Sequence, residues 1–336
     1  MQQKMARATR GDIPANLRSN RFATLLLGAL LGAGAHALAQ DAYPNRPLSL
    51  VVPFDAGSQP DVIARAVAEG LREALGKAVV VQNKSGAAGT IGVEFVARAV
   101  ADGYTLGFGP PGQFTVQPKL RKNFPYAIRD FDFICQTNAA VFLLVTSAKS
   151  PYSTMAEVID AARRVPGKLN LGTGGQGTSP HLAAEWIARH AGVSFNHVPF
   201  RNTSDMYVQL INGSLDLVAT TPNAVATRAD FKPLVLIADE RLSRHPSIPL
   251  AREIGFPLAS FGSMMGLYAP KGMPAHARLA LREACPKVVE SALLKSVANT
   301  TSTPIAYLDS EHYTARIVEE SRELGGLIDQ LGMAVK

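Results

Sequence analysis

The chain has few of the residues that build reactive thiols or disulfide frameworks, with only two cysteines among its 336 residues. Cys135 falls in an apolar, strand-like run and Cys285 in a helical stretch, and neither belongs to a CxxC or Cys–His signature. A reactive thiol is therefore not expected. A single disulfide is an open alternative for an exported chain, but two buried thiols that pack as small apolar side chains are the favoured interpretation.

Motifs for metal and cofactor chemistry are also missing. The histidines show no HExxH or comparable spacing, so we expect no metal site. The glycines of residues 86–92 lack both the GxG start of a dinucleotide fingerprint and the GK[ST] of a phosphate loop, so no cofactor is expected. The sequence thus offers no motif for metal-dependent or cofactor-dependent chemistry.

One pair of residues keeps an exported hydrolase open as the less favoured alternative. Ser179 and His181 lie close together in the sequence. Both fall in the first turn of an expected helix, where capping explains a serine better than catalysis does. The nearest approach to a nucleophile elbow, residues 262–266, does not match GxSxG.

The charge is low and mixed. The formal net charge of +7 comes from 34 basic and 27 acidic residues. The first 39 residues hold five of the basic residues and one of the acidic ones, which leaves 29 against 26, or +3. This remainder has no block of like charge and no basic helix face, so no nucleic-acid partner is expected.

The first 39 residues have the pattern of a secretory signal peptide. A basic segment leads into the apolar run 22–38, and Ala37-Leu38-Ala39 fits a small-residue cleavage site. We expect cleavage before Gln40 and a periplasmic mature protein, with an uncleaved membrane anchor as the alternative. No later apolar stretch is long enough for a membrane helix.

The most informative stretch is a strand that runs through a polar loop into a helix. The strand covers residues 48–52, and the amphipathic helix ends at Gly76. Ser58 and Asp61 are spaced like a capping pair, and Pro60 suits the first helical turn because it lacks an N–H. Such a helix N-terminus presents unpaired N–H groups and a partial positive charge, which suit a carboxylate or a phosphate.

The same junction occurs a second time in the chain. Residues 57–61 read GSQPD and residues 177–181 read GTSPH, and each segment follows an apolar strand and precedes an amphipathic helix. If the two junctions face each other across a cleft, they could hold two anionic groups of one small molecule. Chance similarity over five residues is the alternative.

Strands and helices alternate along the chain, which predicts an α/β fold with parallel strands. Residues 40–140 are expected to form the first part of lobe 1, and residues 141–262 to form lobe 2. Residues 263–336 are expected to return to lobe 1, beginning with a strand at 264–268.

Two finer expectations concern breaks in the regular elements. The apolar run 131–145 is expected to break at residues 136–138, where three polar residues follow one another. The chain is expected to close with two helices, one at 275–294 interrupted by Pro286 and one at 310–331.

The sequence from residue 43 onward resembles the Bug-type substrate-binding receptors of tripartite tricarboxylate transporters. The resemblance rests on YPNRPLSLVVPFDAGSQPDVIARAVAEGL, VVVQNKSGAAGTIGVEFVARAVADGYTLGFG, PGKLNLGTGGQGTSPHLAAEWI, HVPFRN and LYAPKGMP. It implies a type II periplasmic-binding architecture, in which two α/β lobes enclose a ligand cleft, and it implies no catalysis. Ligands of this family are typically small carboxylates, held largely by backbone amides and waters.

The resemblance also implies which residues contact the ligand. The positions that match the two junction loops and the segment after the next strand are Phe54, Ala56, Gly57, Ser58, Asp61, Thr173, Gly174, Gly175, Gly177, Thr178, His181, Phe200 and Arg201. For His181, contact with the ligand and simple exposure to solvent are equally open.

This sequence departs from the family pattern at several positions. Asp55 replaces an apolar residue or proline, and it is either a contact for an ammonium group or, as we prefer, a solvated loop charge. Ser58 replaces a glycine, and Pro110-Pro111 replace small residues in a third cleft loop. Thr220, another candidate ligand contact, stands with Thr221 where many relatives have an acidic residue.

The sequence therefore predicts an extracytoplasmic solute receptor that captures a small organic anion, a mono- or dicarboxylate. Its other expected partners are the subunits of a membrane permease, and the receptor is expected to be a monomer. A ligand-sensing adaptor of the same fold, acting on a membrane sensor kinase, is the alternative.

Overall fold

The structure is a computed structural model that describes residues 43–139, 141–226, 228–238, 240–242, 244–256, 264–330 and 332–334. The predicted signal peptide, residues 1–39, lies outside the described residues, as does the predicted boundary between lobes near residues 262 and 263. Within the described ranges, no helix is both long and apolar enough to span a membrane.

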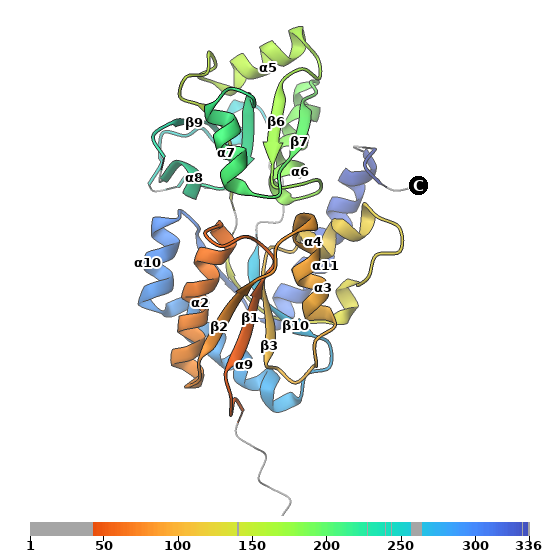
Figure 1. Cartoon of the computed structure of the whole chain (residues 1–336), viewed down its shortest axis with the longest axis vertical. Coiled ribbons are helices and arrows are strands. Elements are labelled where there is room, and N and C mark those ends of the chain that lie inside the picture. Colours follow the sequence, from red (N-terminus) through yellow and green to blue (C-terminus); the bar gives the residue numbers. More distant parts are fainter. Residues whose placement is uncertain are drawn as a thin grey trace, which may run out of the picture. The chain divides into compact units, whose positions relative to one another are not determined.

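Two separate β-sheets organise the described chain. The first sheet has the strand order β11-β4-β10-β3-β1-β2. Its strands are β1 (Leu48–Val52), β2 (Val79–Asn83), β3 (Thr105–Gly109), β4 (Phe131–Asn138), β10 (Met265–Pro270) and β11 (Ile305–Leu308). β1 pairs in parallel with β2 and β3, whereas β10 is antiparallel to β3 and β4. Figure 1 shows β2, β1, β3 and β10 side by side, so this sheet combines strands from both ends of the chain.

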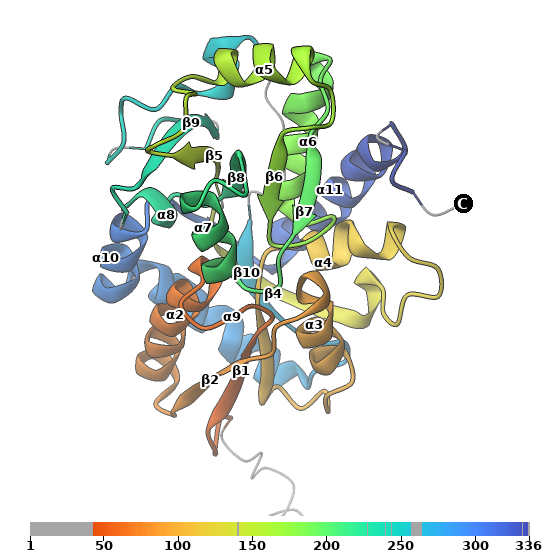
Figure 2. The same ribbon diagram turned by 45° about the horizontal axis from the view of Figure 1, so that its top comes forward.

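The second sheet repeats this arrangement. Its strand order is β7-β6-β8-β5-β9, and Figure 2 shows β5, β8, β6 and β7 side by side. The strands are β5 (Phe142–Ser147), β6 (Asn170–Thr173), β7 (Asn196–Pro199), β8 (Leu217–Thr220) and β9 (Phe231–Ile237). β6 has parallel neighbours on both sides, as β1 has, and β5 is antiparallel to β8 and β9. The structure thus confirms the predicted α/β fold class with two lobes.

The helices connect and cover these strands. They are α2 (Gln59–Leu75), α3 (Thr90–Ala97), α4 (Gly112–Thr115), α5 (Met155–Arg164), α6 (Ser179–Ala191), α7 (Thr203–Ile211), α8 (Asn223–Ala226), α9 (Ala275–Glu290), α10 (Ala292–Thr300) and α11 (Ser310–Gln330), with short 3₁₀ turns η2 (Ala87–Gly89), η3 (Gln117–Lys119), η4 (Ile128–Asp130) and η5 (Ala251–Ile254). α2 packs against both α9 and α10. Its stripe of Ile63, Val67 and Leu71 is fully buried, and each such side chain contributes roughly 1.5–3 kcal/mol through the hydrophobic effect.

α2 and α6 occupy equivalent positions in the two lobes. α2 follows β1 and α6 follows β6, and β1 and β6 are the strands with parallel neighbours on both sides. The repeated GSQPD and GTSPH segments therefore stand at matching points of two similar sheets. This placement argues against chance similarity, because the carboxyl ends of such strands are where α/β folds generally bind ligands.

Two expected breaks are wrong. β4 continues through the polar residues 136–138, all of which are buried, and the chain leaves the strand only after Asn138. α9 likewise continues through Pro286 to Glu290. The break comes at Ser291, whose hydroxyl accepts the Leu294 N–H and so caps the start of α10. The strand β11 was not predicted from the sequence, because its four residues are largely half-buried and show no clear alternation of polar and apolar positions.

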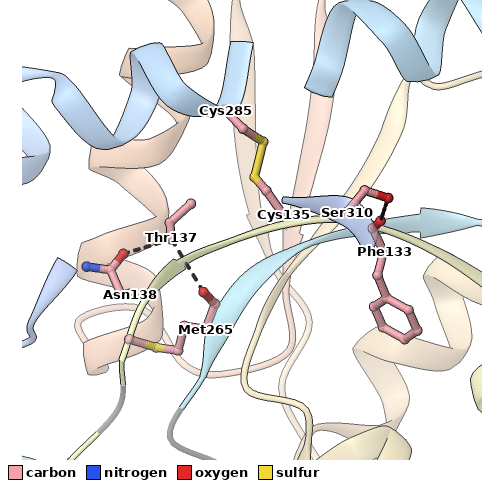
Figure 3. Close-up of a disulfide and its surroundings, with 7 residues drawn as sticks. All are labelled: Phe133, Cys135, Thr137, Asn138, Met265, Cys285 and Ser310. Atoms are coloured by element: carbon pink, nitrogen blue, oxygen red, sulfur yellow. Dashed lines mark hydrogen bonds between the residues drawn. A yellow bond between two sulfur atoms is a disulfide. The ribbon is translucent and has the colours of Figure 1, made fainter. Parts of the chain in front are cut away.

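A disulfide joins β4 to α9, so the favoured interpretation of two free thiols is wrong. Figure 3 shows Cys135 and Cys285 bonded. Their Cα atoms are 6.5 Å apart, and their sequence separation is 150. Both cysteines are fully buried. Ser310, at the start of α11, donates to the Phe133 carbonyl at 2.7 Å in the same region. β4 is thus fixed to the two helices that pack on it.

Candidate functional site

The first junction loop, residues 53–58, is held by Asp61 rather than by a capping serine. Ser58 is the N-cap residue of α2, but its side chain makes no capping hydrogen bond. Instead the Asp61 carboxylate accepts the Gly57 N–H at 2.9 Å. The predicted Ser58–Asp61 capping pair is therefore wrong, whereas Pro60 does lie in the first turn as predicted. The Ser58 Oγ is buried and has no hydrogen-bond partner among the described residues.

Asp61 is fully occupied by the loop and its neighbours. It accepts from Arg65 Nε and Nη2 at 3.0 Å and from Asn83 Nδ2 at 2.8 Å. Burial alone would raise the pKa of Asp61, but the hydrogen bonds from Arg65, Gly57 and Asn83 outweigh it and lower the pKa. Asn83 also donates to the Phe54 carbonyl at 3.0 Å. Asp61 is therefore a charged support for the loop.

The other candidates in this loop are more accessible. Ala56 and Gly57 are exposed, whereas Phe54 and Asp55 are half-buried. The Asp55 carbonyl accepts the Ser58 N–H at 3.1 Å, which closes the turn. Gly57 has φ +79°, a left-handed conformation that glycine adopts without a side-chain penalty.

The second junction loop, residues 174–178, has the same geometry with histidine in place of aspartate. Thr178 is the N-cap residue of α6, again without a side-chain capping bond and again followed by proline in the first turn. The Gly177 N–H donates to His181 Nδ1 at 3.1 Å, just as the Gly57 N–H donates to Asp61. Each loop is thus tied to the residue four positions ahead.

His181 is a buried, neutral imidazole. Only 3% of the residue is exposed, so the solvent-exposed interpretation is wrong. Its ring stacks on His197 with centroids 3.9 Å apart, and its Nε2 lies 3.8 Å from Glu185 Oε1. Burial and, to a smaller extent, His197 lower the pKa of His181 to about 3. The hydrogen bond accepted at Nδ1 places the single ring proton on Nε2.

Internal hydrogen bonds shape the rest of the second loop. The Gly175 N–H donates to Thr173 Oγ1 at 3.2 Å, and Thr178 Oγ1 donates to the Gly175 carbonyl at 2.8 Å. Thr173 Oγ1 also pairs with His197 Nε2 at 2.6 Å. A β-carbon added at Gly174 would meet nothing within 4 Å. The hydroxyl groups therefore fix the backbone of the loop, while Gly174 is open to a ligand.

The second loop contacts segments of the first lobe that follow β2 and β3. Gln117 Nε2 donates to the Gln176 carbonyl at 2.8 Å. A β-carbon on Gly177 would overlap Leu120 Cδ1 and lie 2.8 Å from Gln117 Nε2, and one on Gly175 would lie 3.4 Å from Ala88 Cβ. The two lobes therefore approach each other closely at this loop, and glycine is what permits it.

Two glutamines at this contact were missed in the sequence. Gln113 and Gln117 are 3% and 1% exposed, and Gln113 Nε2 donates to the Ala88 carbonyl at 3.1 Å. The Oε1 atoms of both glutamines are buried and have no hydrogen-bond partner among the described residues. Their place shortly after β3, at the predicted third cleft loop, was the one signal in the sequence. Isolated glutamines form no recognisable motif.

The three remaining candidates lie on the second sheet or at its edge. Phe200 is half-buried, and its N–H donates to the Thr173 carbonyl at 2.9 Å. Arg201 is exposed, and its guanidinium forms no hydrogen bond or ion pair with any residue that the structure describes. Thr220 is buried, and its hydroxyl shares a 2.7 Å hydrogen bond with the Tyr207 hydroxyl. Of the three, Arg201 is therefore the one with an unused charge.

A metal centre finds no support in the part of the chain that the structure describes. No group of three or more His, Cys, Asp or Glu residues there lies close enough to hold a metal ion. The candidate site can instead donate hydrogen bonds to a ligand from two helix N-termini and from buried amide side chains.

Two α/β lobes with similar strand orders and a matched helix N-terminus in each define the two-lobed architecture of periplasmic binding proteins. Solved structures agree. The chain is similar to the structure of periplasmic binding protein BugD (TM-score 0.80, 26% identity, 88% of this chain and 100% of that one). It is also similar to R. palustris Rpa4515 with adipate (TM-score 0.81, 25% identity, 87% of this chain and 99% of that one).

Sequence comparison gives the family. The family model TctC, described as the tripartite tricarboxylate transporter family receptor, matches residues 63–333. A UPF0065 protein of Bordetella pertussis is 34% identical over 257 residues, which cover 76% of this chain and 78% of that protein. The chain belongs to the tripartite tricarboxylate transporter receptor family, as the resemblance predicted. This is a family of solute-binding receptors, not of enzymes.

Proposed function

We propose that the chain is an exported receptor that captures a small mono- or dicarboxylate between its lobes and delivers it to a tripartite tricarboxylate-type membrane transporter. In this proposal residues 40–140 and 263–336 form lobe 1, and residues 141–262 form lobe 2. Signal peptide cleavage before Gln40 places the receptor in the periplasm, and intact mass of the exported protein tests that step.

The observation that carries the proposal is the matched pair of helix N-termini. The N–H groups of Gly57 and Gly177 donate to Asp61 and His181, so these two donors hold the loops and are not available to a ligand. The first-turn N–H groups of α2 and α6 have no partner within their helices. These groups and the helix dipoles favour an anion at each junction.

Side chains at the two junctions support the same ligand class. Ser58 Oγ is a buried hydroxyl without a partner among the described residues, and a carboxylate oxygen would accept its proton. Arg201 adds an exposed positive charge after β7. The structure of Rpa4515, 25% identical to this chain, was solved with adipate, a dicarboxylate.

A thermal-shift panel on the chain from residue 40 onward tests the ligand class. The panel contains mono- and dicarboxylates, amino acids, neutral sugars and cationic amines, because a ligand that binds only the folded state raises the melting temperature. The proposal expects carboxylates to give the largest shifts. Shifts from sugars or amines alone would contradict it.

Delivery is tested separately from binding. The mature receptor, with and without its best ligand, is used to capture membrane proteins from the native host. Recovery of transporter subunits in a ligand-dependent way supports delivery to a permease, whereas recovery of a sensor kinase alone would favour the sensing adaptor.

A further inference from the structure

α11 carries a carboxyl group that is completely buried and that neither junction loop uses. Glu320 is 0% exposed, and its Oε1 lies 2.9 Å from Thr115 Oγ1 in α4. Its Oε2 is also buried and has no hydrogen-bond partner among the described residues. The neighbouring Arg316 pairs instead with Glu319 at 3.0 Å and with Glu323 at 3.6 Å. A buried carboxylate with one neutral donor and no cation would be costly.

The two contacts of the Thr115 hydroxyl indicate whether Glu320 carries a proton. Thr115 Oγ1 is 3.2 Å from the Pro111 carbonyl as well as 2.9 Å from Glu320 Oε1. A threonine hydroxyl has one proton to donate, and a carbonyl oxygen can only accept. A single Thr115 proton shared between the two acceptors would make both bonds weak, whereas both are full hydrogen bonds if Thr115 donates to the Pro111 carbonyl and a protonated Glu320 donates to Thr115 Oγ1.

We propose that Glu320 is a neutral carboxylic acid that positions the start of α4 through the hydrogen-bond chain Glu320 Oε1–H to Thr115 Oγ1–H to the Pro111 carbonyl. α4 and η3 lie at the contact between the lobes described above. A β-carbon on Gly112 would lie 3.4 Å from Ser179 Oγ at the N-terminus of α6, and Gln117 reaches Gln176. Glu320 is therefore a positioning residue for the candidate site, and its effect on ligand binding rests on the proposed function.

The surroundings of Glu320 favour the neutral form. Burial raises the pKa of Glu320 to about 8, against the lowering effects of Arg316 and of any proton that Thr115 donates to the carboxylate. α11 packs against α4, β4 and β11. The ionisable groups on these elements, on the adjoining η3 and on α11 near Glu320 are Asp132, Tyr307, Lys119, Tyr313, Arg316, Glu319, Arg322 and Glu323. Lys119 Nζ donates to the Ser321 carbonyl, and Asp132 is bound by Lys271.

Ionisation of Glu320 would break the chain of hydrogen bonds. The carboxylate would then accept the Thr115 proton, and the Pro111 carbonyl would lose the Thr115 hydroxyl and keep only the backbone N–H groups of Phe114 and Thr115. If only the protein with neutral Glu320 binds ligand, the apparent affinity falls by the fraction that stays neutral. With a pKa of about 8, roughly one molecule in eleven is neutral at pH 9, so the affinity is expected to fall about tenfold between pH 7 and pH 9.

The first test measures the protonation state without any ligand. The infrared difference spectrum between the mature protein and Glu320→Gln should show a protonated-carboxyl stretch at pH 7 that fades above pH 8. A carboxylate band at pH 7 would overturn the proposal. Because this readout needs no ligand, it decides the state of Glu320 even if the proposed function fails.

The second test follows ligand affinity from pH 6.5 to pH 9 by calorimetry, with a carboxylate that is fully ionised over this range. The wild type should lose about tenfold, and Glu320→Gln, which stays neutral, should change less than twofold. Glu319→Gln, an exposed neighbour, is the matched control and should behave as the wild type does. Equal pH dependence in the wild type and Glu320→Gln would overturn the positioning role.

Discussion

Replacing the two equivalent loop glycines by alanine separates backbone strain from contact between the lobes. Gly57 and Gly177 have nearly the same conformation, with φ +79° and +72°. Either substitution therefore costs roughly 1–2 kcal/mol of backbone strain in the folded protein. A β-carbon at Gly57 would meet nothing within 4 Å. One at Gly177 would overlap Leu120 and lie 3.1 Å from Val116 Cγ1.

The extra cost at Gly177 falls on the state in which the lobes touch, since Val116 and Leu120 belong to the other lobe. Overpacking of this kind costs roughly 1–3 kcal/mol. If ligand binding requires that contact, Gly177→Ala should weaken binding about 5- to 150-fold, because each 1.4 kcal/mol is a factor of ten. Gly177→Val should weaken it further. Gly57→Ala should lower the melting temperature by a similar amount to Gly177→Ala but change affinity much less.

The assay is calorimetry with the best carboxylate from the panel, with thermal melts of the same preparations without ligand. The melts show whether each variant is folded, and the difference between the two alanine variants isolates the contact between the lobes. Gly177→Ala that binds as tightly as Gly57→Ala would refute the reasoning.

Three further outcomes are expected. Ser58→Ala should weaken carboxylate binding only by a few-fold, because it removes one hydroxyl donor worth about 1 kcal/mol and leaves the backbone donors in place; a loss beyond a hundredfold by calorimetry would contradict this. Replacing Cys135 and Cys285 together by serine should lower the free energy of unfolding in urea by about 2–5 kcal/mol, since the disulfide closes a long loop, whereas an unchanged midpoint would argue against the bond. Because the pKa of Asp61 is lowered in the folded state, its contribution to stability is present above the unfolded-state pKa and is lost as pH falls through the folded-state pKa. Below about pH 4 the melting temperature of the wild type should therefore fall more steeply than that of Asp61→Asn. Parallel curves of melting temperature against pH would count against the role of Asp61 in supporting the loop.

Local sequence pattern was sufficient for the elements and the repeated junctions. The short apolar strand β1, the amphipathic α2 and the glycine stop at Gly76 follow from spacing and residue type alone. The GTSPH segment was recognisable because it repeats the same backbone requirement, a left-handed glycine before a helix with an early proline.

Features that depend on distant contacts could not be read in the same way. The bond between Cys135 and Cys285 depends on where α9 packs on β4. The two cysteines are separated by 150 positions, and no local sequence pattern shows that they lie close together in the fold. Residues 136–138 looked like a loop because they are polar, yet Thr137 donates to the Asn138 side chain at 2.8 Å inside the strand. Three consecutive buried polar residues show no alternation of polar and apolar positions, so the sequence pattern does not reveal the strand.

The roles of individual polar side chains were the hardest to foresee. Ser58 and Asp61 have the spacing of a capping pair, but Asp61 reaches back to Gly57 because Arg65 and Asn83 hold its carboxylate in place. Glu320 lies in a helix that the sequence correctly placed, but only its burial against α4 gives the carboxyl group a role.

The central claim is that the matched helix N-termini of α2 and α6 bind a small carboxylate. Calorimetric titration of the chain from residue 40 onward with adipate and shorter dicarboxylates, with a neutral sugar and a cationic amine as controls, tests this most directly. The account predicts one site per chain for at least one carboxylate, with no heat from the controls. Saturable binding of the sugar or the amine, with none of the carboxylates bound, would contradict it.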